Sequence, residues 1–212
     1  MTKRSTRKVV HRQPRQPGDR IGGDGQSVLG RLTDHESATI LRVLLQRHDS
    51  LLPEAEKLAG ELVSVSSSDD VTDSVLDALT SVDLDDLNDR AGATRWGYVE
   101  PTEAAWELLE EAVEDFIADL KRRAELGSSD AAVMMCRGIV AGLYKAKDVP
   151  SDGALGWAPD FPVEEARHVV SELLRAIPDQ TRDAIRARFL EAIVADAPDW
   201  AEMLIRAASE GD

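Results

Sequence analysis

Large apolar residues recur every three or four positions along most of this chain, and the longest such pattern lies near its centre. Between Thr102 and Leu126 this spacing draws one stripe along a helix and does not alternate as a strand would. Pro101 suits the first position of that helix, and Gly127 suits the residue that closes it. A second helix is predicted over Asp130–Ala146, so Gly127-Ser128-Ser129 would join the two into a long helical hairpin.

Two glycines interrupt the second helix of this hairpin at a spacing of four. Gly138 and Gly142 therefore share one side of the helix, where each costs about 1 kcal/mol of helix propensity relative to alanine. We expect another helix to approach the backbone closely on that side.

Shorter helical patterns flank the hairpin. In the first of them, Ile40, Leu41, Leu44 and Leu45 are predicted to face inward. The stretch 148–162 is rich in Pro, Gly and Asp and is predicted to be a loop. Further helices are predicted near 34–47, from Pro53, after a break and cap at Ser66-Ser67-Ser68-Asp69, and near 84–91, 163–176, 179–195 and 199–209. The fold class is therefore all-α, an array of about seven to nine helices in antiparallel pairs around the central hairpin.

The distribution of aromatic residues suggests how the chain is divided. All nine lie between Trp96 and Trp200. Residues 33–92 are thus predicted to form an aromatic-free helical subdomain, and residues 93–212 an aromatic-rich one packed on it. Residues 1–32 contain few apolar side chains and are predicted to be a disordered tail.

Charge is also unevenly distributed. The whole chain has a net charge of −15, yet residues 1–32 hold eight Lys or Arg against two Asp. The acidic remainder would repel a phosphate backbone, so nucleic acid is expected to bind only through residues 1–30, if at all. A nucleic-acid-associated regulator with a basic arm is therefore one alternative function, and a solvated tail is the structural alternative.

Several classes of protein are disfavoured. Cys136 is the only cysteine, so an internal disulfide or a cysteine zinc site is not expected, and a buried structural thiol is predicted. No apolar run approaches the roughly 18 residues of a membrane span, and no secretory signal is evident. We expect a cytoplasmic protein, and the excess of Arg over Lys suggests a bacterial source.

The best candidate contact region lies at the open end of the hairpin. Antiparallel packing would place the start of its first helix beside the end of its second, together with part of the loop that follows. Aromatic and basic side chains gathered there are typical of a surface that binds a peptide or an anionic ligand. The same rings would equally serve as core that closes the bundle. The candidate residues are Arg95, Trp96, Tyr98, Trp106, Tyr144, Lys147, Trp157 and Phe161.

Carboxylates supply the remaining candidates for chemistry. Glu103, Glu107, Glu110 and Glu114 form a stripe at helical spacing, which favours a solvated outer face over metal ligation. Glu165 and His168 match half of a di-iron motif, but a second copy is missing. We therefore predict no catalytic, metal-binding or cofactor-binding residue and no cofactor.

These patterns favour a non-enzymatic helical scaffold that binds a protein or peptide partner. That step rests on analogy with other helical arrays, since no sequence motif for a chemical reaction is present. An enzyme with a carboxylate metal site is the third, least favoured hypothesis.

Overall fold

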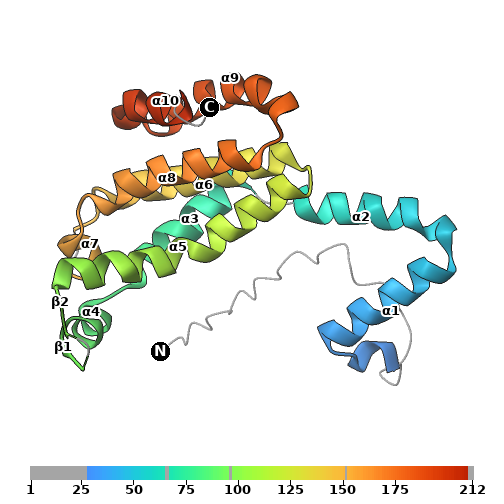
Figure 1. Ribbon diagram of the computed structural model, residues 1–212, viewed down its shortest axis with the longest axis horizontal. Coiled ribbons are helices and arrows are strands. Elements are labelled where there is room, and N and C mark those ends of the chain that lie inside the picture. Colours follow the sequence, from blue (N-terminus) through green and yellow to red (C-terminus); the bar gives the residue numbers. More distant parts are fainter. Residues whose placement is uncertain (1–27, 65–66, 96, 151, 210–212) are drawn as a thin grey trace, which may run out of the picture. The chain divides into compact units, whose positions relative to one another are not determined.

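The computed structural model describes residues 28–64, 67–95, 97–150 and 152–209, which fall into two compact units, Met1–Glu54 and Ala55–Asp212. Ten α-helices and one pair of three-residue strands occur within these ranges (Figure 1). The all-α prediction is confirmed, with ten helices in place of the seven to nine expected. Most of the predicted disordered tail lies outside the described residues, and its last part, Val28–Arg31, forms the 3-10 helix η1.

The described part of the first unit consists of η1, α1 (Asp34–Arg47), η2 (Asp49–Leu51) and the start of α2 (Leu52–Ser64). Thr33 begins α1 with a capping box. Its hydroxyl accepts from the Glu36 amide at 3.3 Å, and the Glu36 carboxylate accepts from the Thr33 amide at 2.9 Å. Within the first unit no residue of α1 is buried: Ile40, Leu41 and Leu44, which were predicted to face inward, are exposed, and Leu45 is half-buried.

The second unit holds the remaining elements. The central hairpin is present as α5 and α6, and Gly127 closes α5 with a φ of +75°. The bounds are α3 (Ser68–Ser81), α4 (Leu84–Arg90), β1 (Gly92–Thr94), β2 (Gly97–Val99), α5 (Pro101–Glu125), α6 (Ser129–Ala146), α7 (Ala154–Trp157), α8 (Phe161–Ala176), α9 (Asp179–Asp196), η3 (Pro198–Trp200) and α10 (Ala201–Ser209).

Helix α6 is the centre of this unit. It packs against α3, α5, α8 and α9 (Figure 1). Buried residues occur on several of its faces. A helix that is apolar almost all round is stable only when other helices surround it. Cys136 is fully buried in α6 as a free thiol, as predicted, and burial raises the pKa of this thiol far above its usual value.

The two glycines of α6 lie against α3. A Cβ atom built on Gly138 would come within 2.6 Å of the Val71 Cβ, and one on Gly142 within 2.8 Å of the Val75 Cβ. The Thr72 hydroxyl also donates a hydrogen bond to the Gly138 carbonyl, at 3.2 Å. The predicted close approach of another helix is confirmed, and α3 is the helix that makes it.

One short helix and one pair of short strands were not expected from the sequence. Helix α7 lies within the predicted loop 148–162, where the Ala154 amide donates to the Val82 carbonyl at 3.3 Å. Strands β1 and β2 pair antiparallel just before α5, and Gly92 and Gly97 both take positive φ values. Four-residue helices and three-residue strands are too short to show a hydrophobic period.

No helix in the described ranges combines the length and the apolar character needed to cross a membrane.

Candidate functional site

The predicted aromatic contact residues occupy several different places. Trp106 of α5 and Phe161 at the start of α8 meet edge to face, with ring centroids 5.2 Å apart. Phe161 is fully buried, whereas Trp106 is only half-buried. This pair helps to fasten α8 to α5.

Tyr144 and Lys147 belong to a second cluster, at the end of α6. The Tyr144 ring packs edge to face on Trp200 at 5.0 Å, and its hydroxyl donates to Asp199 at 2.7 Å. The Lys147 ammonium lies 2.8 Å from the same carboxylate and 4.4 Å from the Tyr144 ring centroid. These two donors lower the pKa of Asp199, and that carboxylate raises the pKa of Lys147.

The other predicted contact residues are exposed or undescribed. Tyr98 is 62% exposed and Trp157 is 47% exposed, and Arg95 is exposed as well. Trp96 lies outside the described residues. A partner contact through Tyr98 and Trp157 therefore stays a prediction.

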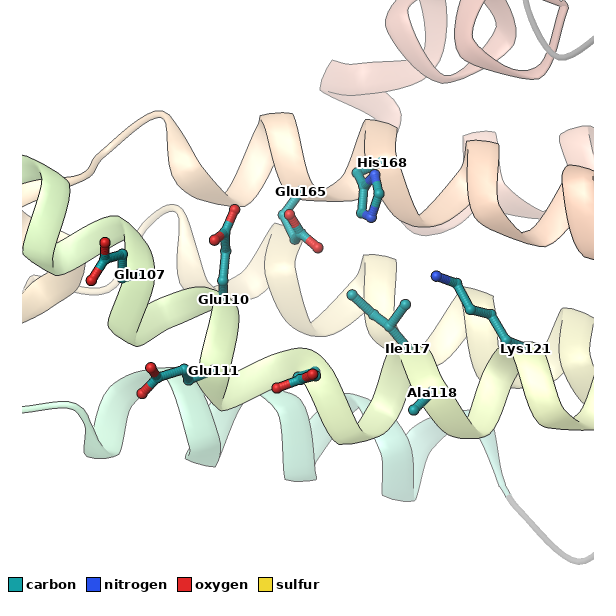
Figure 2. A pocket seen from close by; sticks show the side chains of 9 residues that line it. Glu107, Glu110, Glu111, Ile117, Ala118, Lys121, Glu165 and His168 are labelled. Atoms are coloured by element: carbon teal, nitrogen blue, oxygen red, sulfur yellow. The ribbon is translucent and has the colours of Figure 1, made fainter.

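A groove elsewhere on the second unit is lined by charged side chains that the sequence pattern did not predict to lie together. An open groove of about 550 Å³ runs between α5 and α8 (Figure 2). Carboxylates dominate its walls, with aliphatic side chains of α5 beside them. The lining residues are Glu107, Glu110, Glu111, Glu114, Ile117, Ala118, Lys121, Glu165 and His168.

Two of these carboxylates are held by a neighbouring helix. Arg90 of α4 binds Glu111 through two hydrogen bonds of 2.8 and 2.9 Å and Glu107 through one of 3.2 Å. The paired guanidinium lowers the pKa of Glu111. Because Arg90 supplies only one positive charge, this wall of the groove stays negative.

Glu110 has a different neighbour. Its carboxylate accepts from the Trp106 indole at 3.0 Å. Figure 2 shows its side chain rising from α5 toward α8, where the Glu165 carboxylate lies beside it. Two acidic groups therefore face each other across the groove, and neither is ion-paired to a cation in the described part of the chain.

Glu165 is the unusual member of the set. It is only 6% exposed, and no hydrogen bond or ion pair reaches its carboxylate within the described residues. Lys121, whose positive charge acts on Glu165, pairs instead with Glu172, which also accepts from Arg175. Burial first, and then the negative charges of Glu110 and Glu172, raise the pKa of Glu165 to about 7.

The sequence contained a signal for this side chain. The buried face of α8 recurs at positions 165, 166, 169, 170, 173 and 174, and Glu165 is its one charged member. A carboxylate on the apolar stripe of a helix is expensive to bury unless something pairs with it. The carboxylate stripe of α5 concealed the site, because nothing in its spacing shows that α8 covers one side of it.

The groove is suited to a positively charged organic group. A cationic head would pair with Glu110 and Glu165, and an aliphatic stem would contact Ile117 and Ala118. Among the described residues, no group of three or more His, Cys, Asp or Glu side chains is placed to hold a metal ion.

Replacing Glu165 with glutamine is expected to change how stability depends on pH. Between pH 4.5 and 7 the unfolded chain releases this proton while the folded chain keeps it, so wild-type stability falls as pH rises. The variant should therefore match wild type near pH 4 and exceed it by about 1–2 kcal/mol near pH 8, a value reduced because the groove is open to water. Urea unfolding at both pH values measures this, and an equal difference at both would contradict the assignment.

Comparisons with protein families, with curated proteins and with solved structures found no match to this chain.

Proposed function

We propose that this protein is a non-enzymatic helical scaffold that binds a basic peptide segment of a partner protein in the groove between α5 and α8. The observation that carries the proposal is the buried residue Glu165, whose carboxylate faces Glu110 and makes no hydrogen bond or ion pair within the described residues. An arginine side chain supplies the missing charge in a planar form that hydrogen-bonds two carboxylates at once.

The shape and charge of the groove support a peptide over other ligands. Its length along α5, from Glu107 to Lys121, is about 21 Å at 1.5 Å per residue, which suits several peptide residues. Its negative walls would repel a nucleic-acid backbone. Apolar floor residues beside the charges fit the mixed character of a lysine or arginine side chain.

A defined peptide pair tests the proposal. Capped hexa-arginine is titrated into the full chain at 150 mM salt and pH 8, and capped hexa-citrulline serves as the uncharged peptide of similar shape. We expect Glu165→Gln to weaken hexa-arginine binding about tenfold, because a charge-assisted contact in a partly buried site is lost. Calorimetry gives the dissociation constants. Titration of hexa-citrulline should release no more heat than its dilution into buffer.

A matched variant separates the groove from the general attraction of an acidic chain for a basic peptide. Glu125→Gln removes the same charge from the exposed far end of α5. It should leave affinity within about twofold, since exposed charges are well screened at this salt concentration. Equal weakening by Glu125→Gln and Glu165→Gln would show that binding is diffuse and would overturn the proposal.

The basic N-terminal segment remains the basis of the second hypothesis, a nucleic-acid-associated regulator. Most of that segment, residues 1–27, lies outside the described residues, so its role stays a prediction from composition.

A further inference from the structure

Glu165 differs from the other acidic residues that line the groove between α5 and α8. Glu107, Glu110, Glu111 and Glu114 are all exposed, whereas Glu165 is buried. A carboxyl group in contact with water is already ionised well below neutral pH. Of the acidic side chains in this groove, Glu165 is therefore the one whose charge can change close to neutrality.

The position of Glu165 favours its neutral, protonated form. The residue has little contact with water, so a charge there is poorly solvated. Its carboxyl group makes no hydrogen bond or ion pair within the described residues. Glu110 lies across the groove (Figure 2), and Glu172 follows two turns later on the same helix. Burial and these two negative charges raise the pKa of Glu165 to about 7.

The helices packed against α8 are α5, α6 and α10, and their charges do not neutralise Glu165. Lys121 of α5 lines the groove and lowers the pKa of Glu165 in part, but it pairs with Glu172. His168 lies one turn along α8 and is exposed. The charged groups of α6 and α10 have other neighbours: Asp130 pairs with Arg188, Arg137 with Asp196 and Lys145 with Asp73, and Glu202 and Arg206 line a separate recess with Glu164 and Arg167.

A proton and a cationic side chain compete for this carboxyl group. When Glu165 is ionised, it and Glu110 present two negative charges to an arginine or a lysine. When Glu165 is protonated, one of those charges is lost and the carboxyl group has one acceptor site fewer for a guanidinium, which only donates. A ligand that prefers the ionised form must therefore lower the pKa of Glu165 and release a proton as it binds.

We propose that the groove between α5 and α8 is a proton-sensitive binding site, in which protonation of Glu165 weakens the hold on a basic peptide segment when the surroundings become mildly acidic. The inference rests on the proposed function, because it concerns the same ligand in the same groove. It adds that one buried proton controls the affinity, so the partner is bound in neutral or basic conditions and released in mild acid.

Titrations of capped hexa-arginine into the full chain at pH 8 and pH 6, both at 150 mM salt, test the proposal. If ionised Glu165 binds about tenfold more tightly than its neutral form, as expected for Glu165→Gln, wild-type affinity should fall about fivefold from pH 8 to pH 6. Glu165→Gln should bind with the same weak affinity at both pH values, within about twofold. Calorimetry at pH 6.5 in two buffers of different ionisation enthalpy should show about half a proton released per peptide bound to wild type, and far less with the variant.

His168 requires its own control, because histidine is the other side-chain type in the groove that ordinarily gains charge between pH 8 and pH 6. A positive His168 would also repel a basic peptide. In His168→Gln the ratio of affinities at the two pH values should stay within about twofold of the wild-type ratio, since the exposed ring is screened by water and salt. Loss of the pH dependence in His168→Gln, with its survival in Glu165→Gln, would overturn the assignment to Glu165.

The proton on Glu165 can also be followed directly by NMR. In protein carrying ¹³C at the side-chain carboxyl of glutamate, the resonance that is missing from Glu165→Gln belongs to Glu165. Without ligand it should titrate near pH 7, and hexa-arginine added at pH 6.5 should move it toward its ionised position. A resonance that titrates below about pH 5, or that hexa-arginine leaves in place, would overturn the proposal.

The two proposals for this groove fail in different ways. If hexa-arginine does not bind at pH 8, the proposed function fails and the proton-sensitive site fails with it. If hexa-arginine binds at pH 8 and Glu165→Gln weakens it, but wild-type affinity is the same at pH 6, the proposed function stands and only the proton-sensitive site is overturned.

Discussion

Replacing Phe161 with alanine is expected to lower the free energy of unfolding by about 3–5 kcal/mol, the largest effect of any single change considered. The ring is fully buried at the start of α8 and packs edge to face on Trp106. Its removal leaves a cavity and also a ring contact unmade, since the helices around it relax only in part. Chemical denaturation monitored by circular dichroism measures the loss.

The exposed members of the same predicted contact set provide the comparison. Tyr98→Ala and Trp157→Ala should each cost less than about 1 kcal/mol, because both side chains are about half or more exposed to water already. A loss of several kcal/mol from either variant would identify that ring as core and remove it from the candidate contact surface. A small loss from Phe161→Ala would contradict the packing of α8 on α5.

Replacing Gly138 with alanine is expected to lower the free energy of unfolding by about 2–4 kcal/mol, although alanine is the better helix former by about 1 kcal/mol. The new methyl group would lie within 2.8 Å of the Ser68 carbonyl oxygen as well as against Val71. Backbone cannot move aside as a flexible side chain can, so α3 and α6 would have to separate. Thermal and urea unfolding measure the change.

Gly60→Ala is the matched control for this substitution. Gly60 lies within α2, where an added Cβ would meet no atom within 4 Å. There the helix propensity acts alone, and stability should stay the same or rise by up to about 1 kcal/mol. If Gly138→Ala behaved like Gly60→Ala, the close approach of α3 to α6 would be absent in solution.

Helix positions were largely predictable from the sequence because they depend on local spacing and end signals. The bounds predicted for α1 agree with the structure, and those of α5 and α6 agree within a residue. Gly138 and Gly142 also predicted a tertiary contact, because only a close neighbour explains two glycines on one side of a helix. The apolar stripe of α1 predicted an inward face, but the first unit alone does not bury it, because a stripe shows that a helix needs a partner and not which element supplies one.

The groove between α5 and α8 was beyond the reach of sequence spacing alone. The stripe on α5 suggests a solvated face, and only the packing of α8 beside it brings Glu110 and Glu165 together. The aromatic residues were predicted to form one cluster, but the structure shows two separate ring pairs. Trp106 packs on Phe161, and Tyr144 packs on Trp200. Pairings of this kind depend on helix order and rotation, which residue type does not encode.

The central place of α6 bears on how the chain folds as it is synthesised. The hydrogen bond from Thr72 to Gly138 joins residues 66 positions apart, so α3 leaves the ribosome well before its main partner exists. Until α6 follows, Val71 and Val75 lack the glycine side of α6 against which they pack. Helix α5 is synthesised before α6 and contacts α3 and α4, but its contacts with α6 form only once α6 folds back beside it. The second unit should therefore fold in one late step, after α6 has been released, rather than helix by helix from its beginning.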